Sequence, residues 1–261
     1  MSKRIFAAAM LVVLASPFMA LAAEVQGDTG SEQAGDWSWR VTPYVWLSGL
    51  NGKVGVFSGL PAADASATFG DIFDVTDYGF QVNTEKRFTE KLAFVGDFSY
   101  MKLSTDIDIP AEAGGGKIAL ESTTMIAQPM VAYRLVEGED YMFDLLGGGR
   151  VWTLENEVKV KGGTHDGAKR DDKEQWLDPL LGFRVRKDLN EKWFLNFQGD
   201  LGGFDVGSQF TWMGQAGVGY HINDRVAALL MYRYLDVDYE NDGMVWDVSM
   251  EGVLLGVSYL F

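Results

Sequence analysis

Apolar and polar residues alternate one by one through most of the chain after Trp37, and this period of two is typical of β-strands with one apolar and one polar face. In the first such stretch, Trp39–Leu47, the odd positions are apolar, whereas Arg40 and Thr42 lie on the opposite face. Similar stretches begin near Tyr78, Leu92, Ala127, Tyr141, Leu177, Trp193, Trp212, Leu230 and Met250. Together they predict ten antiparallel strands.

The connections between these stretches alternate between short and long. We expect tight turns at Thr89-Glu90, Glu137–Glu139, Asp188–Glu191 and Asn223-Asp224. We expect longer polar loops at Thr105–Lys117, Lys161–Lys173 and Asp236–Asp242, and a short loop at Asp205–Ser208. Short turns at one end and long loops at the other are typical of transmembrane up-and-down β-barrels.

The segment from Asn51 to Asp74 is harder to interpret. Gly52–Phe57 and Ala65–Phe69 predict a short hairpin, but each arm is shorter than the ~9–11 residues of a membrane-crossing strand. We therefore expect an extension above the membrane and a tucked turn at Asp71–Asp74. The barrel would have twelve strands if both arms crossed the membrane, and eight strands if the first hairpin lay outside the barrel.

The last stretch, Met250–Phe261, has one continuously apolar face that ends in aromatics. Its members are Val253, Leu255, Val257, Tyr259 and Phe261, and the other face carries mostly small residues. This pattern is typical of a strand that meets lipid and an aromatic belt. The ending resembles the closing strand of Gram-negative outer-membrane β-barrels. That resemblance implies that Val257, Tyr259 and Phe261 form an insertion signal read by the barrel-assembly machinery.

The start of the chain has the features of a secretory signal peptide. Lys3 and Arg4 precede a short apolar run, and an Ala-x-Ala site ends at Ala22. The run is too short for a spanning helix, which needs ~20 residues. We expect residues 1–23 to be the signal peptide, 24–36 a flexible periplasmic lead-in, and 37–261 the barrel.

Composition fits this assignment. The chain has 31 glycines but 6 prolines, and its mean hydropathy of -0.03 is what cancelling polar and apolar faces would produce. The absence of cysteine excludes disulfides and thiol chemistry. The net charge of -15 falls to -17 without Lys3 and Arg4, and this acidity makes nucleic acid an unsuitable partner.

The orientation of the two faces decides between a membrane barrel and a soluble barrel. The apolar faces lack charge and carry aromatics near their ends: Trp39, Tyr100, Tyr133, Tyr141, Trp193, Trp212, Tyr220 and Tyr259. The polar faces carry Arg40, Glu85, Asp97, Arg134, Asp144, Arg150, Asp178, Arg184, Arg186, Asp200 and Arg233. Their basic partners are all arginine, whose planar fork suits confined ion pairs. We therefore expect outward apolar faces and a charge-paired lumen.

The carboxyl-terminal third carries a second resemblance. Gly217–Arg225 and the run from Tyr232 to Tyr239 resemble many small outer-membrane barrel proteins of Proteobacteria, in the porin-like superfamily. This resemblance implies an all-β transmembrane barrel in the outer membrane, in contact with outer-membrane lipid, and names no cargo.

Candidate chemistry is sparse. His221 begins a predicted turn and is interpreted as a solvated residue, whereas His165 lies beside Asp166 without a recognisable serine motif. The acidic run Asp238–Gly243 fails the calcium-loop spacing, because Ser249 stands where the closing glutamate belongs. We therefore predict no catalytic residue, metal site or cofactor, and no enzyme.

The leading hypothesis is an outer-membrane barrel that is structural or acts as a narrow porin-like channel for small polar solutes. One alternative is an outer-membrane enzyme acting on lipid or peptide at the extracellular rim near His165. The other is a soluble periplasmic ligand-binding barrel.

Overall fold

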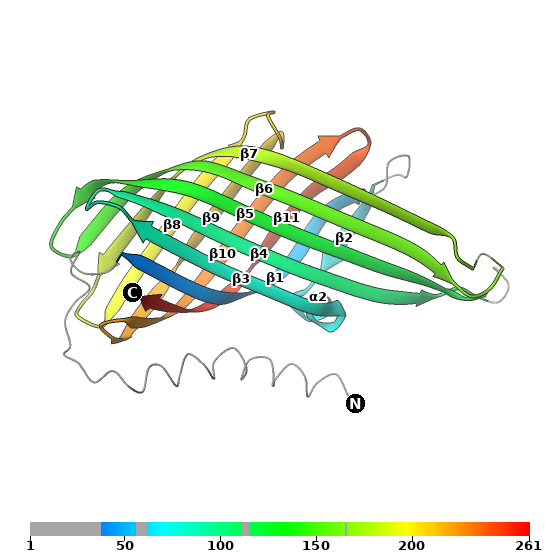
Figure 1. Ribbon diagram of the computed structural model, residues 1–261, viewed down its shortest axis with the longest axis horizontal. Coiled ribbons are helices and arrows are strands. Elements are labelled where there is room, and N and C mark those ends of the chain that lie inside the picture. Colours follow the sequence, from blue (N-terminus) through cyan, green and yellow to red (C-terminus); the bar gives the residue numbers. More distant parts are fainter. Residues whose placement is uncertain (1–37, 56–61, 111–114, 165) are drawn as a thin grey trace.

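The structure is a computed structural model that describes residues 38–55, 62–110, 115–164 and 166–261 (Figure 1). Its strands are β1 Trp39–Gly55, β2 Ala63–Ala67, β3 Thr76–Arg87, β4 Leu92–Asp108, β5 Lys117–Glu137, β6 Tyr141–Lys161, β7 Lys169–Asp188, β8 Trp193–Gly203, β9 Phe210–Asn223, β10 Val226–Asn241 and β11 Met244–Leu260. Its helix is α2, Phe69–Val75. The predicted signal peptide and lead-in lie outside the described residues.

The strands form one closed antiparallel barrel. Each long strand pairs with its neighbours in the sequence, and β11 returns to pair with β1 from Arg40–Leu260 to Gly55–Val245. On its other side β1 pairs with β3 near one end and with β2 near the other. Because β2 and β3 share one place in the wall, the barrel has ten strand positions. The predicted ten-stranded up-and-down barrel is confirmed.

The predicted hairpin has β1 and β2 as its arms and is followed by a helix: its first arm is the end of β1 as far as Gly55, with residues 56 and 57 outside the described residues, and Phe69 begins the helix. β1 continues without a break to Gly55, and β2 pairs back against it. The predicted turn at Asp71–Asp74 is the helix α2, which begins because Thr68 and Asp71 cap each other: each side chain accepts a hydrogen bond from the backbone of the other.

The two ends of the barrel differ, as the spacing predicted. The end that carries Ser38 and Phe261, here called the terminal end, has short connections, whereas the opposite loop end carries α2 and the longer hairpins (Figure 1). β5 and β6 have 21 residues each, about twice the ~9–11 needed to cross a bilayer. They therefore project well beyond the membrane at the loop end.

Three predicted loops are wrong in extent. β4–β7 continue into the regions predicted as Thr105–Lys117 and Lys161–Lys173 loops, and β10 continues to Asn241. The β4–β5 and β6–β7 extensions are held by cross-strand ion pairs. Lys102 and Glu121 are 2.8 Å apart, and Lys169 and Glu157 are 3.0 Å apart.

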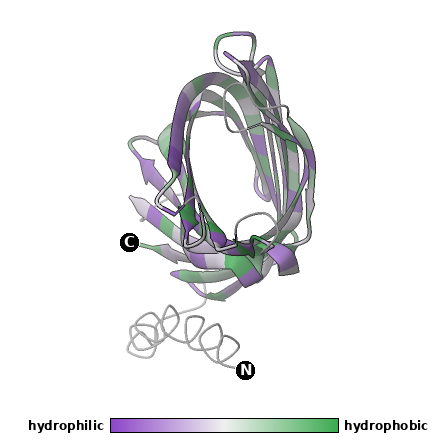
Figure 2. Ribbon diagram, turned by 90° about the vertical axis from the view of Figure 1, so that its right-hand side faces the viewer, coloured by the Kyte–Doolittle hydropathy of each residue, from purple (hydrophilic) through white to green (hydrophobic). Residues whose placement is uncertain are grey.

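The apolar faces point outward and the charged faces point into the lumen, and hydropathy alternates along the strands around the ring (Figure 2). On β9 the outward rings of Trp212 and Tyr220 are eight residues apart, roughly 27 Å at ~3.4 Å per residue. With a strand tilt of ~40°, this separation gives a band of about 20 Å, close to the ~25 Å apolar band of such barrels. None of the described helices could cross a membrane as a long apolar segment.

Candidate functional site

The barrel interior gathers the eleven charged residues that the sequence singled out. Those buried are Glu85, Arg134, Asp144, Arg150, Asp178, Arg184, Arg186, Asp200 and Arg233. The side chains of Arg40 and Asp97 are slightly more exposed, at 15% and 19%. All of them belong to inward positions of their strands, so the alternation places them in one lumen.

A first network lies toward the terminal end and centres on Glu85, which is 0% exposed. Its carboxylate accepts hydrogen bonds from Arg40 and, at 2.7 Å, from Nη1 of Arg184. Nη2 of Arg184 donates to Asp144 at 2.6 Å, and Nε of Arg134 donates to the other Asp144 oxygen at 2.8 Å. Arginines and carboxylates thus alternate around the wall, which satisfies charges that could not be buried singly.

A second network crosses the middle of the lumen and centres on Arg150. Its guanidinium donates to Gln128 at 3.1 Å, to Thr211 at 2.9 Å and to Asp200 at 2.7 Å. Gln128 also donates to the second Asp200 oxygen at 2.9 Å. These residues come from β5, β6, β8 and β9, so one arginine joins several parts of the wall.

Arg233 forms a third group with Tyr44 and Asp97. Nη1 of Arg233 donates to the Tyr44 hydroxyl at 3.0 Å, and that hydroxyl donates to Asp97 at 2.7 Å. The guanidinium carbon lies 5.1 Å from the Tyr44 ring centre and 5.4 Å from that of Trp46. Arg233 is therefore held by hydrogen bonds and by the faces of two aromatic rings.

Two of the charged residues have other local roles. Asp178 accepts hydrogen bonds from the Ser208 backbone at 2.6 Å and from the Ser208 hydroxyl at 2.9 Å, which anchors the β8–β9 loop. Arg186 donates to Asp188 at 2.9 Å, and its guanidinium lies 3.9 Å from the Phe194 ring centre.

The loop-end half of the lumen holds an apolar cluster that the sequence reasoning missed. Trp152, Trp176 and Tyr239 stack in a row, with ring centres 5.5 Å and 3.9 Å apart. We call the surrounding set the aromatic plug: Trp46, Trp152, Leu154, Trp176, Leu235, Val237, Tyr239, Met244, Trp246 and Val248. The sequence did contain a signal for this cluster. Trp152 lies two residues from Arg150 and Trp176 two residues from Asp178, so both rings share the inward face with these charges, and an open polar channel does not need inward aromatics.

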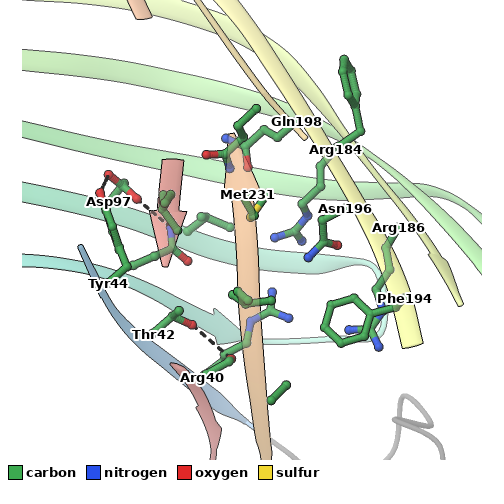
Figure 3. Close-up of a pocket in the computed structure, with 18 of the residues that line it drawn as sticks. Arg40, Thr42, Tyr44, Asp97, Arg184, Arg186, Phe194, Asn196, Gln198 and Met231 are labelled. Carbon is green, nitrogen blue, oxygen red and sulfur yellow. Dashed lines mark hydrogen bonds between the residues drawn. The ribbon is translucent and has the colours of Figure 1, made fainter. Parts of the chain in front are cut away.

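A cavity of about 90 Å³, here called the terminal vestibule, lies in the lumen at the terminal end (Figure 3). Arg40 from β1 and Arg184 and Arg186 from β7 reach toward this space from different walls. Its inner wall includes Tyr44, Met231 and Leu254, which also pack in the apolar cluster around the plug. The vestibule therefore ends against that cluster.

The structure corrects the interpretation of His221. It lies in β9 rather than in a turn, is only partly exposed, and its Nε2 is 3.0 Å from Nη2 of Arg186 in the wall of the vestibule. His165 lies outside the described residues. In the described part of the chain, no three His, Asp or Glu side chains are placed to hold a metal ion.

The residues of the expected insertion signal lie at the seam of the barrel. Val257 and Phe261 are exposed on the outer face, at 43% and 58%. Tyr259 is only 9% exposed, and its ring centre is 4.5 Å from that of Phe261. The Phe261 backbone N–H donates to the Trp39 carbonyl at 2.8 Å, which joins the end of the chain to β1.

The sequence matches no protein-family model. No curated protein matches it either. Two solved structures share its architecture. The outer membrane protease OmpT from Escherichia coli aligns with a TM-score of 0.57 and 9% identity, over 88% of this chain and 100% of that one. The translocator domain of the autotransporter NalP from Neisseria meningitidis aligns with a TM-score of 0.53 and 14% identity, over 98% and 97%.

At these identities the likeness concerns the fold. The closed barrel, the outward apolar band, the buried charge networks and the two structural matches agree. The chain has the fold of the bacterial outer-membrane β-barrel proteins.

Proposed function

We propose that this chain is a structural barrel of the outer membrane whose lumen is closed at rest. The observation that carries the proposal is the aromatic plug. Trp152 and Val237 are 0% exposed in the loop-end half of the lumen, where an open porin would hold water. A barrel of this strand number has little internal room, so packed rings can fill its cross-section.

The charge networks support closure from the other side of the plug. Arg150 bonds to Thr211 and Asp200, and Arg184 bonds to Glu85, and these bonds join strands that are not neighbours in the sheet. Arg184 also bonds to Asp144 on the neighbouring strand β6. Fully satisfied buried networks are rigid, because breaking one bond leaves a charge without compensation. The charge networks and the aromatic plug would together make the barrel rigid and keep its lumen closed.

The outer surface supports the location. The apolar band and its aromatic girdles fit a bilayer, and the sequence begins with the features of a signal peptide. In this placement the terminal end faces the periplasm, the projecting hairpins face the outside, and the last strand is read by the barrel-assembly machinery. Outer-membrane lipid surrounds the band.

A second candidate is the narrow porin-like channel for small polar solutes. The observation in its favour is the terminal vestibule, whose arginine-lined wall would select solutes by charge. In this alternative the plug must move before a solute passes.

Fractionation and planar-bilayer recording test the proposal. We expect the protein in the outer-membrane fraction, with faster gel migration when unheated, and we expect refolded protein to leave a bilayer silent. Recovery in the soluble periplasmic fraction would overturn the location. Steady conductance of the unmodified protein would overturn the closed lumen and support the channel.

A further inference from the structure

The terminal vestibule is surrounded by more cationic than anionic side chains. Arg40, Arg184, Arg186 and Arg233 line it from three strands, and Arg225 lines it from the β9–β10 turn. Figure 3 shows the first three reaching into the same space from separate parts of the wall. Five guanidinium groups thus converge on a cavity of about 90 Å³.

The compensating carboxylates lie behind these arginines rather than in the cavity wall. Glu85 and Asp144 are 0% and 2% exposed, accept hydrogen bonds from Arg184, and do not line the vestibule. Asp97 does line the vestibule: its oxygens accept hydrogen bonds from Tyr44 at 2.7 Å and Asn83 at 3.1 Å, and one of them lies 3.4 Å from Nη2 of Arg233. The side chains that line the cavity therefore include five arginines and one carboxylate.

The cationic groups are held in place before any ligand arrives. Arg186 is fixed by Asp188 at 2.9 Å and by the Phe194 ring at 3.9 Å. Arg233 donates to Gln215 at 2.9 Å as well as to Tyr44. Immobilised donors lose less entropy on binding, and a confined cavity with low-dielectric walls strengthens their attraction for an anion.

We infer that the terminal vestibule is a binding site for a small oxyanion, a carboxylate or a phosphate, which enters from the terminal end. The cavity has room for about three water molecules at ~30 Å³ each, which is the size of a single tetrahedral or short carboxylate anion. Met231 and Leu254 form an apolar part of the wall that a short alkyl tail can contact. Guanidinium forks bind both kinds of anion with paired hydrogen bonds.

Anion binding in the vestibule does not require that the barrel conducts. The inference rests on the proposed function in one respect, which is the compartment from which the anion comes. The inference is tested by isothermal titration calorimetry, which measures anion binding to refolded protein in detergent micelles at constant ionic strength. One series uses inorganic phosphate and the other uses propanoate, so the contribution of the apolar wall is measured separately.

The variants are Arg186→Gln and Arg225→Gln, with Lys192→Gln as the matched control. Lys192 is an exposed lysine at the same end of the barrel and does not line the vestibule. We expect saturable binding of at least one anion, weakened at least tenfold by Arg186→Gln and severalfold by Arg225→Gln. The control should bind as the unmodified protein does.

Heat-modifiable migration checks that each variant is folded. If Arg186→Gln does not fold, Arg225→Gln decides, because that side chain is exposed and makes a smaller contribution to the fold. The inference is overturned if neither anion binds saturably, or if the folded vestibule variants bind as tightly as the control. The outcome of the planar-bilayer recordings, which tests the proposed function, does not affect this test of anion binding.

Discussion

Arg184 on β7 and Glu85 on β3 form an ion pair across the lumen, with Nη1 and Oε2 only 2.7 Å apart although the residues are separated by 99 positions. β4, β5 and β6 lie between their strands in the sheet. The pair therefore joins separate parts of the wall through the interior, and Arg184 continues the connection to Asp144.

Replacing Glu85 by Gln should destabilise the barrel by about 3–5 kcal/mol, because Arg40 and Arg184 would keep buried charges without their shared carboxylate. The free energy of unfolding in urea, followed by tryptophan fluorescence of protein in lipid vesicles, measures this loss.

The double variant Glu85→Gln with Arg184→Gln should lose less than the sum of the single variants, because the two residues are coupled. Glu121→Gln is the control. It removes a solvent-accessible pair with Lys102 and should have a much smaller effect, because water screens such a pair. Strict additivity of Glu85 and Arg184 would contradict the coupling across the lumen.

The aromatic plug should control conductance. Trp152→Ala combined with Trp176→Ala removes two stacked rings and should convert a silent barrel into one with discrete channel openings in planar bilayers. Trp193→Ala is the matched control, since Trp193 is 46% exposed on the outer surface. Silence of the folded double variant would show that other groups close the lumen.

Acidification should stabilise the β10–β11 hairpin at the loop end. Burial, followed by repulsion from Asp247 directly opposite, raises the pKa of Asp238 above its ordinary value. A raised pKa means that the folded hairpin binds the proton more tightly than the unfolded chain does. The hairpin therefore gains stability as the pH falls through that raised value.

Hydrogen exchange of amides 236–247, corrected for intrinsic rates, measures this effect between neutral and acidic pH. Asp238→Asn should stabilise the β10–β11 hairpin already at neutral pH. The gain should be less than about 1 kcal/mol, because the two charges are near water. Glu139→Gln, at the terminal end, should leave these amides unchanged. Lower protection of the hairpin at acidic pH would contradict the prediction.

The last residue should matter for assembly more than for final stability. Phe261→Ala keeps the backbone bond to Trp39 but removes an exposed ring that packs on Tyr259. We expect a smaller heat-modifiable fraction in the outer membrane and little change in unfolding of the protein that does assemble. Leu189→Ala, another exposed apolar residue at the terminal end, is the control. Equal assembly of both variants would argue against the insertion signal.

The alternation of residues by itself predicted the strand number, the antiparallel order and which side chains share a face, and the arginines and aromatics of the two faces predicted which face points outward. These features are local, because a period of two assigns each side chain to one face and the turns follow from chain spacing. Arg150 and Asp178, for example, could be assigned to the lumen before any contact was known. Strand ends were predicted less well, since polar hairpins held by pairs such as Lys169–Glu157 resemble loops in sequence.

Only the tertiary structure decided which inward residues meet. Barrel closure and strand stagger bring Glu85 to Arg184, and Trp176 to Tyr239, from distant parts of the chain. The alternation assigns a residue to the inward face but does not give its position along the barrel axis. The sequence alone therefore could not predict the aromatic plug or the cationic vestibule. Whether a lumen is filled or open depends on those heights, because side chains close a barrel only where they lie in the same layer.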